Sequence, residues 1–223
     1  MKKQINILAI SILFLMILSS CTKFGKNVTI EGRVENPITG EGISGVKIVL
    51  EKETLEIPGG IKSIKEVYTD ANGSFELNKF SFRASQITAN TGTAGDYYKI
   101  GWHKDGEYVS TNSTLEIKKG KKLYVDFHMV PYGDYRIVIN NINCQGATDT
   151  MWFRNKWLGY TGFESSYSTS RIGCYSYTSA SPFKIPIGTY IYETKVKRSG
   201  NITFVYDTVT VNETGVSTIF IDY

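Results

Sequence analysis

The chain has 223 residues, of which 25 are Lys or Arg and 21 are Asp or Glu, giving a formal net charge of +4 at pH 7. A balance this even excludes the strongly basic proteins that bind nucleic acid through charge, so no nucleic-acid partner is expected. The length is enough for two small domains.

The first twenty residues are predicted to be a lipoprotein signal peptide. Lys2 and Lys3 supply the positive start, and residues 7–18 form an almost unbroken apolar run that is too short to span a bilayer comfortably. Residues 18–21, Leu-Ser-Ser-Cys, resemble a lipobox, the cleavage site of bacterial signal peptidase II. Cleavage there leaves Cys21 as the first mature residue, carrying a diacylglyceryl thioether and an N-acyl chain such as palmitate. A plain secretory signal with an incidental cysteine is the alternative.

Lipidation of Cys21 predicts stable attachment to a membrane, because two or more acyl chains hold a protein permanently. In enteric-type lipoproteins an Asp after the lipidated cysteine retains the protein in the inner membrane. Thr22 stands there in this chain, so the resemblance implies the outer membrane. Surface-exposed lipoproteins of the Bacteroidetes often carry an acidic cluster after the cysteine, whereas the predicted tether, residues 21–26, contains no acid. The tether therefore favours the periplasmic face over the cell surface.

The segments after the tether alternate apolar and polar residues with a period of two, which is typical of half-buried strands. The pattern is clear over residues 28–34, 46–50 and 123–129. Residues 70–73, Asp-Ala-Asn-Gly, predict a tight turn because Asn and Gly tolerate positive φ. No segment after the signal peptide shows a convincing helical period. We expect an all-β fold of two consecutive antiparallel β-sandwich domains.

The pattern is interrupted at residues 131–134, Pro-Tyr-Gly-Asp, which predict the domain boundary. The first sandwich is expected over residues 27–130 and a second, aromatic-rich sandwich over residues 131–223. In the second half, strands are predicted over 189–197, 202–211 and 216–223. Residues 162–181 show little periodicity and predict a long loop or short edge segments, and long loops in compact domains are often functional.

Three segments of the first half resemble a carboxypeptidase regulatory-like domain, a family with a transthyretin-like β-sandwich. They are residues 28–36, residues 40–50 and residues 68–75, the last of which ends in Asp-Ala-Asn-Gly-Ser-Phe. In carboxypeptidases this module accompanies a zinc peptidase domain, which has no counterpart here, so the resemblance carries no catalytic residue. In the Bacteroidetes the module occurs in outer-membrane transporters and lipoproteins. The second half resembles no family.

No catalytic, metal or cofactor-binding pattern is present. The two histidines, His103 and His128, do not occur in a zinc-binding or nucleophile-elbow motif, and no Gly-rich phosphate loop precedes a helix. A pair of carboxylates for glycoside hydrolysis is not visible in a sequence because it assembles in space. We expect no enzymatic activity and no cofactor.

Aromatic residues crowd the start of the second half. Tyr and Trp combine a large apolar area with a polar group, which suits protein interfaces and stacking on sugar rings. Alternatively, Met151, Phe153 and Trp157 belong to the sandwich core. The candidate ligand-binding residues are Trp152, Trp157, Tyr160, Tyr167 and Tyr175.

Cys144 and Cys174 are predicted to form a disulfide. The compartment permits oxidation, and the lipid occupies the third cysteine, Cys21. The bridge is expected to hold the weakly periodic 162–181 region to the turn after Ile139, with the two Cα atoms about 4.4–6.8 Å apart.

Two short segments match the Asp-Ser/Thr-hydrophobic pattern that Bacteroidetes proteins use for periplasmic O-glycosylation. They place candidate modification sites at Thr150, after Asp149, and at Thr208, after Asp207. A three-residue match arises easily by chance.

These features predict a non-enzymatic envelope lipoprotein, in which the first sandwich acts as a spacer and the second presents a binding surface. One alternative is a carbohydrate-binding lipoprotein that uses the aromatic-rich half. Another is an accessory subunit of an outer-membrane protein complex. The expected partners are the membrane, through the lipid on Cys21, and an envelope protein or a glycan.

Overall fold

The computed structural model describes residues 26–54, 59–81, 84–93, 95, 97–118, 120 and 122–223. These residues form β-strands and one short 3-10 turn, Thr91–Thr93, and no α-helix occurs among them. The described part of the chain therefore contains no helix long and apolar enough to cross a membrane. The all-β prediction is confirmed. The predicted signal peptide, residues 1–20, and the lipidation site Cys21 lie outside the described residues.

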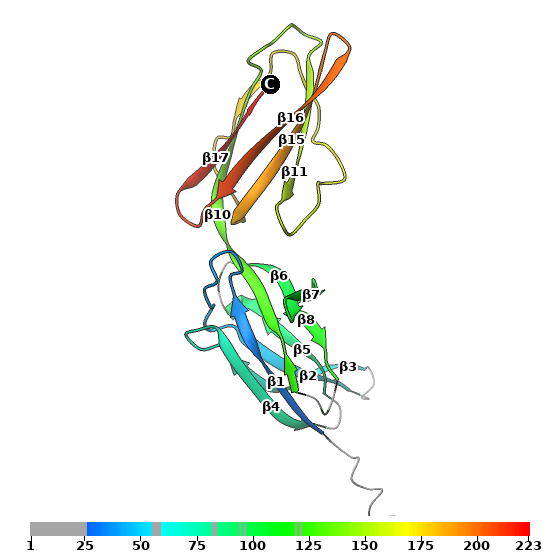
Figure 1. The fold of residues 1–223 in the computed structure, drawn as a ribbon, viewed down its shortest axis with the longest axis vertical. Coiled ribbons are helices and arrows are strands. Elements are labelled where there is room, and N and C mark those ends of the chain that lie inside the picture. The colour runs from blue at the N-terminus through cyan, green and yellow to red at the C-terminus, as the bar shows by residue number, and fades with distance from the viewer. Residues whose placement is uncertain are drawn as a thin grey trace, which may run out of the picture. The chain divides into compact units, whose positions relative to one another are not determined.

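The chain divides into two compact units. Unit 1 takes the segments up to Val34, Gly42–Thr93 and Gly101–Phe127, and unit 2 takes Glu35–Glu41, Ala94–Ile100 and His128–Tyr223. Each unit contains strands from more than one sheet (Figure 1).

The expected interruption at residues 131–134 does not occur. Strand β10 runs unbroken over Asp126–Asn140, and the units divide within it, between Phe127 and His128. Pro131 lies just before Tyr132, the first residue of β10 that pairs with β14. A proline lacks the N–H that a strand ladder uses, so it fits where the strand exchanges one set of partners for another.

Unit 1 is built on two sheets. One has the order β4 (Ser74–Ser81), β1 (Lys26–Glu35), β10, β6 (Tyr97–Lys104) and β7 (Glu107–Ser110), with β9 (Lys122–Tyr124) beside β1. The other has the order β3 (Gly60–Tyr68), β2 (Lys47–Thr54), β5 (Ala84–Asn90) and β8 (Thr114–Glu116).

The core of unit 1 follows the predicted alternation. Apolar residues of 28–34, 46–50 and 75–77 are buried, and the ring of Trp102 packs at a tilt against Phe127, with the ring centroids 4.9 Å apart. The predicted turn at residues 70–73 is present, with φ of +76° at Gly73. Its Asp70 carboxylate accepts hydrogen bonds from the backbone N–H groups of Asn72 and Ser74, both at 2.8 Å.

Unit 2 also contains two sheets. One has the order β12 (Arg171–Ile172), β11 (Thr150–Trp157), β15 (Gly188–Arg198) and β16 (Asn201–Val211). In the other, the second half of β10 pairs with β13 (Ser176–Thr178), β14 (Phe183–Pro186) and β17 (Val216–Asp222). The strands predicted over 189–197, 202–211 and 216–223 are confirmed, and the weakly periodic region contains only short strands.

The sheets are mostly antiparallel, as expected, with two parallel pairings. Strand β17 runs parallel to β10, with Ile219 opposite Ile137, and β9 runs parallel to β1. Ile219 and Ile221 of β17 belong to the core of unit 2, together with Tyr135 and Ile139 of β10.

One glycine in β1 allows a close backbone approach. A Cβ atom at Gly32 would lie 1.6 Å from the carbonyl oxygen of Val125, and backbone atoms cannot yield as a flexible side chain can. We predict that Gly32→Ala lowers the free energy of unfolding of unit 1 by at least about 1–3 kcal/mol, the usual cost of overpacking. Urea unfolding followed by hydrogen exchange in peptides of residues 28–80 measures it. Gly60→Ala, where only the Thr54 hydroxyl comes within 3.9 Å, is the matched control. Equal effects of the two substitutions would contradict the prediction.

Candidate binding surface

The outer face of the sheet β12-β11-β15-β16 gathers the polar and aromatic side chains of unit 2. Residues of one parity are buried in the core, among them Met151, Trp157, Tyr190 and Val196. Since successive side chains of a strand point to opposite faces, residues of the other parity point outward. The register places Trp152 of β11 opposite Lys195 of β15, Arg154 opposite Glu193 and Lys156 opposite Ile191.

Glu193 is the centre of this face. Its side chain accepts hydrogen bonds from the Arg154 Nε at 2.8 Å, from the Tyr206 hydroxyl at 3.0 Å and from the Tyr167 hydroxyl. The residue is only 5% exposed although it lies on the outer face, because these partners cover it. Burial alone would raise the pKa of Glu193, but the bonds from Tyr167, Arg154 and Tyr206 outweigh it and hold the pKa below its ordinary value.

Positive side chains lie over aromatic rings around this carboxylate. The Arg154 guanidinium is 4.6 Å from the ring centroid of Tyr167 and 5.1 Å from that of Phe163. The Lys195 ammonium is 5.2 Å from the Trp152 ring centroid and 5.7 Å from that of Tyr167, and the Lys156 ammonium is 4.9 Å from that of Phe163. These distances are within the range of cation–π attraction. We call this set the cation–aromatic face: Trp152, Arg154, Lys156, Phe163, Tyr167, Glu193 and Lys195.

The segment after β11 supplies Phe163 and Tyr167 because it folds back along that strand. The Glu164 N–H donates to the Asn155 carbonyl at 3.0 Å, and the Ser168 N–H donates to the Phe153 carbonyl at 2.7 Å. The Phe153 N–H in turn donates to the Ser168 hydroxyl at 3.1 Å. These bonds hold a segment of low periodicity in one place.

The five predicted ligand-binding residues are not brought together. Trp152 and Tyr167 belong to the cation–aromatic face, whereas Trp157 is 5% exposed and stacks on Tyr190 in the core. Tyr160 is exposed, with its ring centroid 4.2 Å from that of Trp157, and Tyr175 packs against the core. The alternative reading of Met151, Phe153 and Trp157 as core residues is the one that the packing supports.

Sequence reasoning missed Arg154, Glu193 and Lys195. A signal was present, because the odd spacing of Trp152 and Trp157 within one strand already predicts opposite faces. The same parity puts Arg154 and Lys156 beside Trp152. The pairing of Arg154 with Glu193 depends on the register between β11 and β15, which a single sequence does not reveal.

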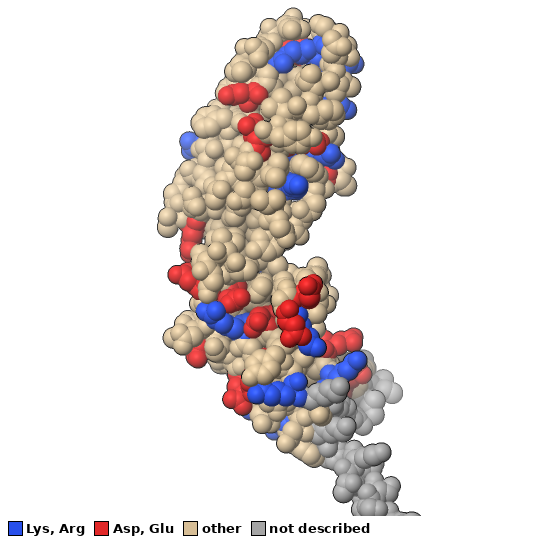
Figure 2. Space-filling view, in the orientation of Figure 1, with Lys and Arg blue, Asp and Glu red and all other residues tan. Residues whose placement is uncertain are grey.

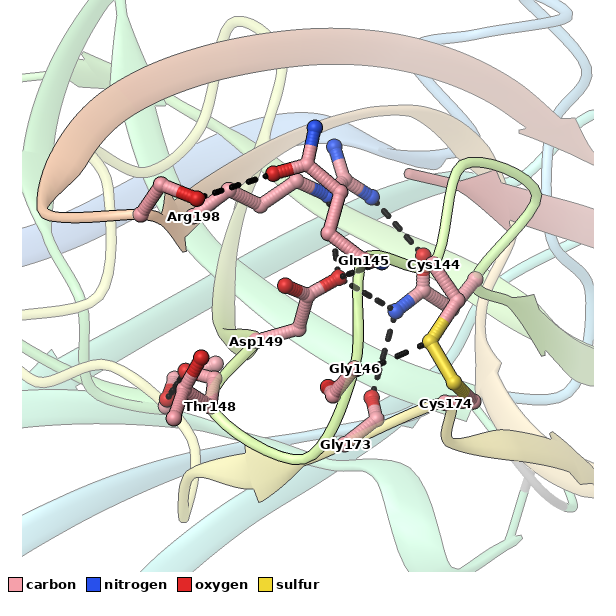
Figure 3. Close-up of polar contacts among 11 residues, drawn as sticks. Cys144, Gln145, Gly146, Thr148, Asp149, Gly173, Cys174 and Arg198 are labelled. Atoms are coloured by element: carbon pink, nitrogen blue, oxygen red, sulfur yellow. Dashed lines mark hydrogen bonds and ion pairs between the residues drawn. A yellow bond between two sulfur atoms is a disulfide. The ribbon is translucent and has the colours of Figure 1, made fainter.

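The predicted disulfide between Cys144 and Cys174 is confirmed, with the Cα atoms 5.2 Å apart. Beside it the carboxylate of Asp149 accepts hydrogen bonds from Asn141 Nδ2 at 3.1 Å, the Gln145 N–H at 3.0 Å and Arg198 Nε at 3.1 Å (Figure 3). The Gln145 bond, with those of Asn141 and Arg198, lowers the pKa of Asp149 against the opposing effect of burial. The bridge therefore ends in a cluster of polar bonds that joins the turn after β10 to the end of β15.

The two candidate O-glycosylation sites differ in their surroundings. Asp149 is fully buried in the cluster just described, and the Thr150 hydroxyl after it donates to the Thr148 carbonyl at 3.2 Å. Thr208 is exposed on β16. Modification of either remains a prediction.

The histidines are held by local partners. His128 Nε2 lies 3.3 Å from a carboxylate oxygen of Glu35, and the His103 ring meets that of Tyr108 edge-on at 5.3 Å. Among the residues that the structure describes, no group of three or more His, Cys, Asp and Glu side chains could hold a metal ion.

Comparisons with known proteins assign no family. No family model matches the chain, and no curated protein matches it. Among solved structures, the minor pilin of Streptococcus agalactiae is 12% identical, with 88% of this chain and 94% of that chain covered and a TM-score of 0.34. The shaft pilin SpaA of Lactobacillus rhamnosus GG is 9% identical, with 89% and 97% covered and a TM-score of 0.28. Values this low assign neither a family nor a function.

We predict that loss of the disulfide destabilises unit 2 alone. Replacing Cys144 and Cys174 by Ser opens a loop with a sequence separation of 30 and is expected to cost roughly 3–4 kcal/mol in the chain-entropy model. Hydrogen exchange resolved by peptide measures both units in one sample. Faster exchange in 141–181 with unchanged exchange in 28–80 is the expected result. Equal loss of protection in both segments would contradict it.

We also predict a pH dependence carried by Glu193. The pKa of Glu193 is lower in the folded than in the unfolded state, so the unfolded state takes up a proton first as the pH falls. The ionised Glu193 therefore contributes its full stabilisation above the pKa of the unfolded state. This stabilisation is lost as the pH falls through the pKa of the folded state. Glu193→Gln should cost about 1–3 kcal/mol at pH 7, since it weakens charged hydrogen bonds. The variant should also lose less stability than the parent between neutral pH and pH 3. Parallel pH profiles of the two proteins would refute this.

Proposed function

We propose that the chain is a non-enzymatic envelope lipoprotein, attached through an acylated Cys21, whose unit 2 binds an acidic partner protein through the cation–aromatic face. Unit 1 acts as the spacer between the membrane and this face. The outer membrane, on its periplasmic side, is the proposed location. The observation that carries the binding role is the combination of three cations and three rings around one neutralised carboxylate.

The charge of the face favours an acidic partner. Arg154 neutralises Glu193, which leaves Lys156 and Lys195 without a carboxylate among the members of the face. Both ammonium groups keep one side toward solvent because cation–π contacts occupy only part of their surface. Positive groups of this kind steer an acidic partner and fix its orientation.

The geometry favours a protein over a neutral sugar. Stacking on a sugar needs an open ring face, whereas the ring of Tyr167 lies against both Arg154 and Lys195, and its hydroxyl is bound to Glu193. Trp157, the second tryptophan of the carbohydrate hypothesis, is in the core. Carbohydrate binding stays as the alternative for acidic glycans, which the two ammonium groups could recognise.

The first test concerns the partner. The mature chain is immobilised and exposed to solubilised outer-membrane proteins and, separately, to neutral and uronic-acid oligosaccharides. We expect Lys156→Glu with Lys195→Glu to weaken binding of the protein partner by about tenfold or more, and the binding to fall as salt is raised. Lys184→Glu with Lys62→Glu, at exposed positions of β14 and β3, is the charge-matched control. Binding of uronic-acid oligosaccharides alone would favour the glycan alternative, and equal binding by all variants would refute the role of this face.

The second test concerns the anchor. We predict that the expressed chain incorporates labelled palmitate and sediments with membranes, and that Cys21→Ala abolishes both, because two or more acyl chains are needed for stable attachment. Cell fractionation and mass spectrometry of the N-terminal peptide measure these outcomes. An unmodified Cys21 in a membrane-bound protein would show that another mechanism holds it there.

A further inference from the structure

Strand β16 leaves one edge of its sheet open. It is the last strand in the order β12-β11-β15-β16, and no other described strand pairs with its far side. Native proteins usually protect long edge strands with charged side chains, because a free edge is a template for pairing with another chain. The outer strands β3 and β4 follow this rule, with lysines at 62, 65 and 79. Strand β16 spans eleven residues with Asp207 as its single charged group.

The hairpin turn fixes which backbone groups face the open edge. Ser199 and Gly200 both have positive φ, and the two-residue turn is closed by Arg198 opposite Asn201. The closing pair of such a turn is hydrogen-bonded, and bonded pairs alternate along an antiparallel ladder. Thr203 and Val205 therefore bond back to β15. The N–H and C=O groups of the residues that alternate with these two point away from β15, toward the open edge. These residues are Ile202, Phe204 and Tyr206.

The side chains along this edge are apolar on both faces. On the outer face Ile202, Phe204 and Tyr206 are 50%, 51% and 58% exposed. On the inner face Val205 is 36% exposed, although its neighbour on β15, Thr194, is fully buried. On the face of unit 2 that Figure 2 shows, charged groups are scattered and most of the surface is uncharged. A further strand at this edge would bury apolar surface on both sides of the sheet.

The charges beside the edge select the kind of strand that fits. Strands β16 and β17 lie next to each other and contain no Lys or Arg, and their acidic residues are Asp207 and Asp222. Burial and the nearby carboxylate of Asp222 raise the pKa of Asp207. The surroundings of Asp207 therefore disfavour its negative charge. A Lys or Arg on an incoming strand would supply the positive charge that stabilises the Asp207 carboxylate. A second copy of β16 brings no cation, so the charges favour a segment of a different protein.

We propose that residues 201–207 of β16 bind an extended segment of a partner protein that adds to the sheet as a further strand, with apolar side chains on both faces and a Lys or Arg that reaches Asp207. Main-chain hydrogen bonds to Ile202, Phe204 and Tyr206 supply the affinity, and the side chains supply the specificity. The edge adjoins the cation–aromatic face, since the Tyr206 hydroxyl donates to Glu193. The main-chain groups that pair with the added strand lie outside that face, so the peptide test below can fail without the function proposed above failing.

The test uses synthetic peptides and the mature chain. The probe is an acetylated peptide of about nine residues, within the usual length of a strand. It alternates Val and Tyr, so that both faces are largely apolar, and carries Lys near each end, so that either strand direction brings a cation to Asp207. One control peptide has the same sequence with N-methyl groups on alternate amides, and another has Glu in place of Lys. Hydrogen exchange of the wild-type chain follows the amides of Ile202, Phe204 and Tyr206. We expect the Lys peptide to protect them and both control peptides to bind at least about tenfold more weakly.

Matched variants separate the backbone from the side chain. Phe204→Pro removes the N–H that faces the open edge, and Phe204→Ala keeps it, so the Pro variant should bind the Lys peptide several-fold more weakly than the Ala variant. Asp207→Asn should abolish the preference for Lys over Glu. Equal binding of the N-methylated and unmodified peptides to the wild-type chain would overturn the proposal without reference to any variant. So would dimerisation in sedimentation experiments that Phe204→Pro prevents, since the edge would then belong to a second copy.

Discussion

The constraint on which unit 2 depends is that its central strands have one buried face and one open face. Strands β11 and β15 each pair with a strand on both sides, so their backbone groups bond within the sheet. Their side chains point to the two faces of the sheet. The core takes large apolar residues from one face of each, such as Met151 and Tyr192. The other face carries charged groups close together. Arg154 and Glu193 form an ion pair there, in which the guanidinium donates a hydrogen bond to the carboxylate and neutralises its charge. The rings and lysines around them extend this pair into a surface.

The same constraint explains how much of the structure could be read from the sequence. A period of two marks a strand and its buried face, so the strands around 28–34, 46–50 and 202–211 and most of their core residues were predictable. Parity within β11 could also have separated Trp152 from Trp157. Compartment and spacing were sufficient for the disulfide between Cys144 and Cys174, because only two cysteines remained to pair.

What could not be predicted depends on which strand lies beside which. The contact between Glu193 and Arg154, which are 39 positions apart in the chain, requires the register between β11 and β15. The parallel direction of β17 depends on the topology of the whole unit, and no local pattern encodes it. The continuity of β10 through residues 131–134 was not predictable, because a proline and a glycine interrupt the alternating pattern there. In β10 Pro131 instead lies where the strand changes partners, and Gly133 allows the close approach of the Asn212 carbonyl, 2.1 Å from where a Cβ would be.

The cation–aromatic face and the disulfide cluster together give the weakly periodic segment of unit 2 a fixed position. Residues 158–170 bury little apolar surface, so backbone bonds to β11 and the contacts of Phe163 and Tyr167 hold them at one end. The bridge at Cys174 holds the segment that follows. A disulfide of this kind persists in an oxidising compartment, which is where the proposed envelope location places the chain.

On the proposed function, the cation–aromatic face meets a partner while the protein is attached to a membrane. A photo-crosslinking amino acid placed at Lys156 in the full chain, and at Lys184 as the comparison, tests this in intact envelopes. We expect one dominant cross-linked protein from position 156 that is absent from position 184. Equal products from both positions, or none from position 156, would contradict it.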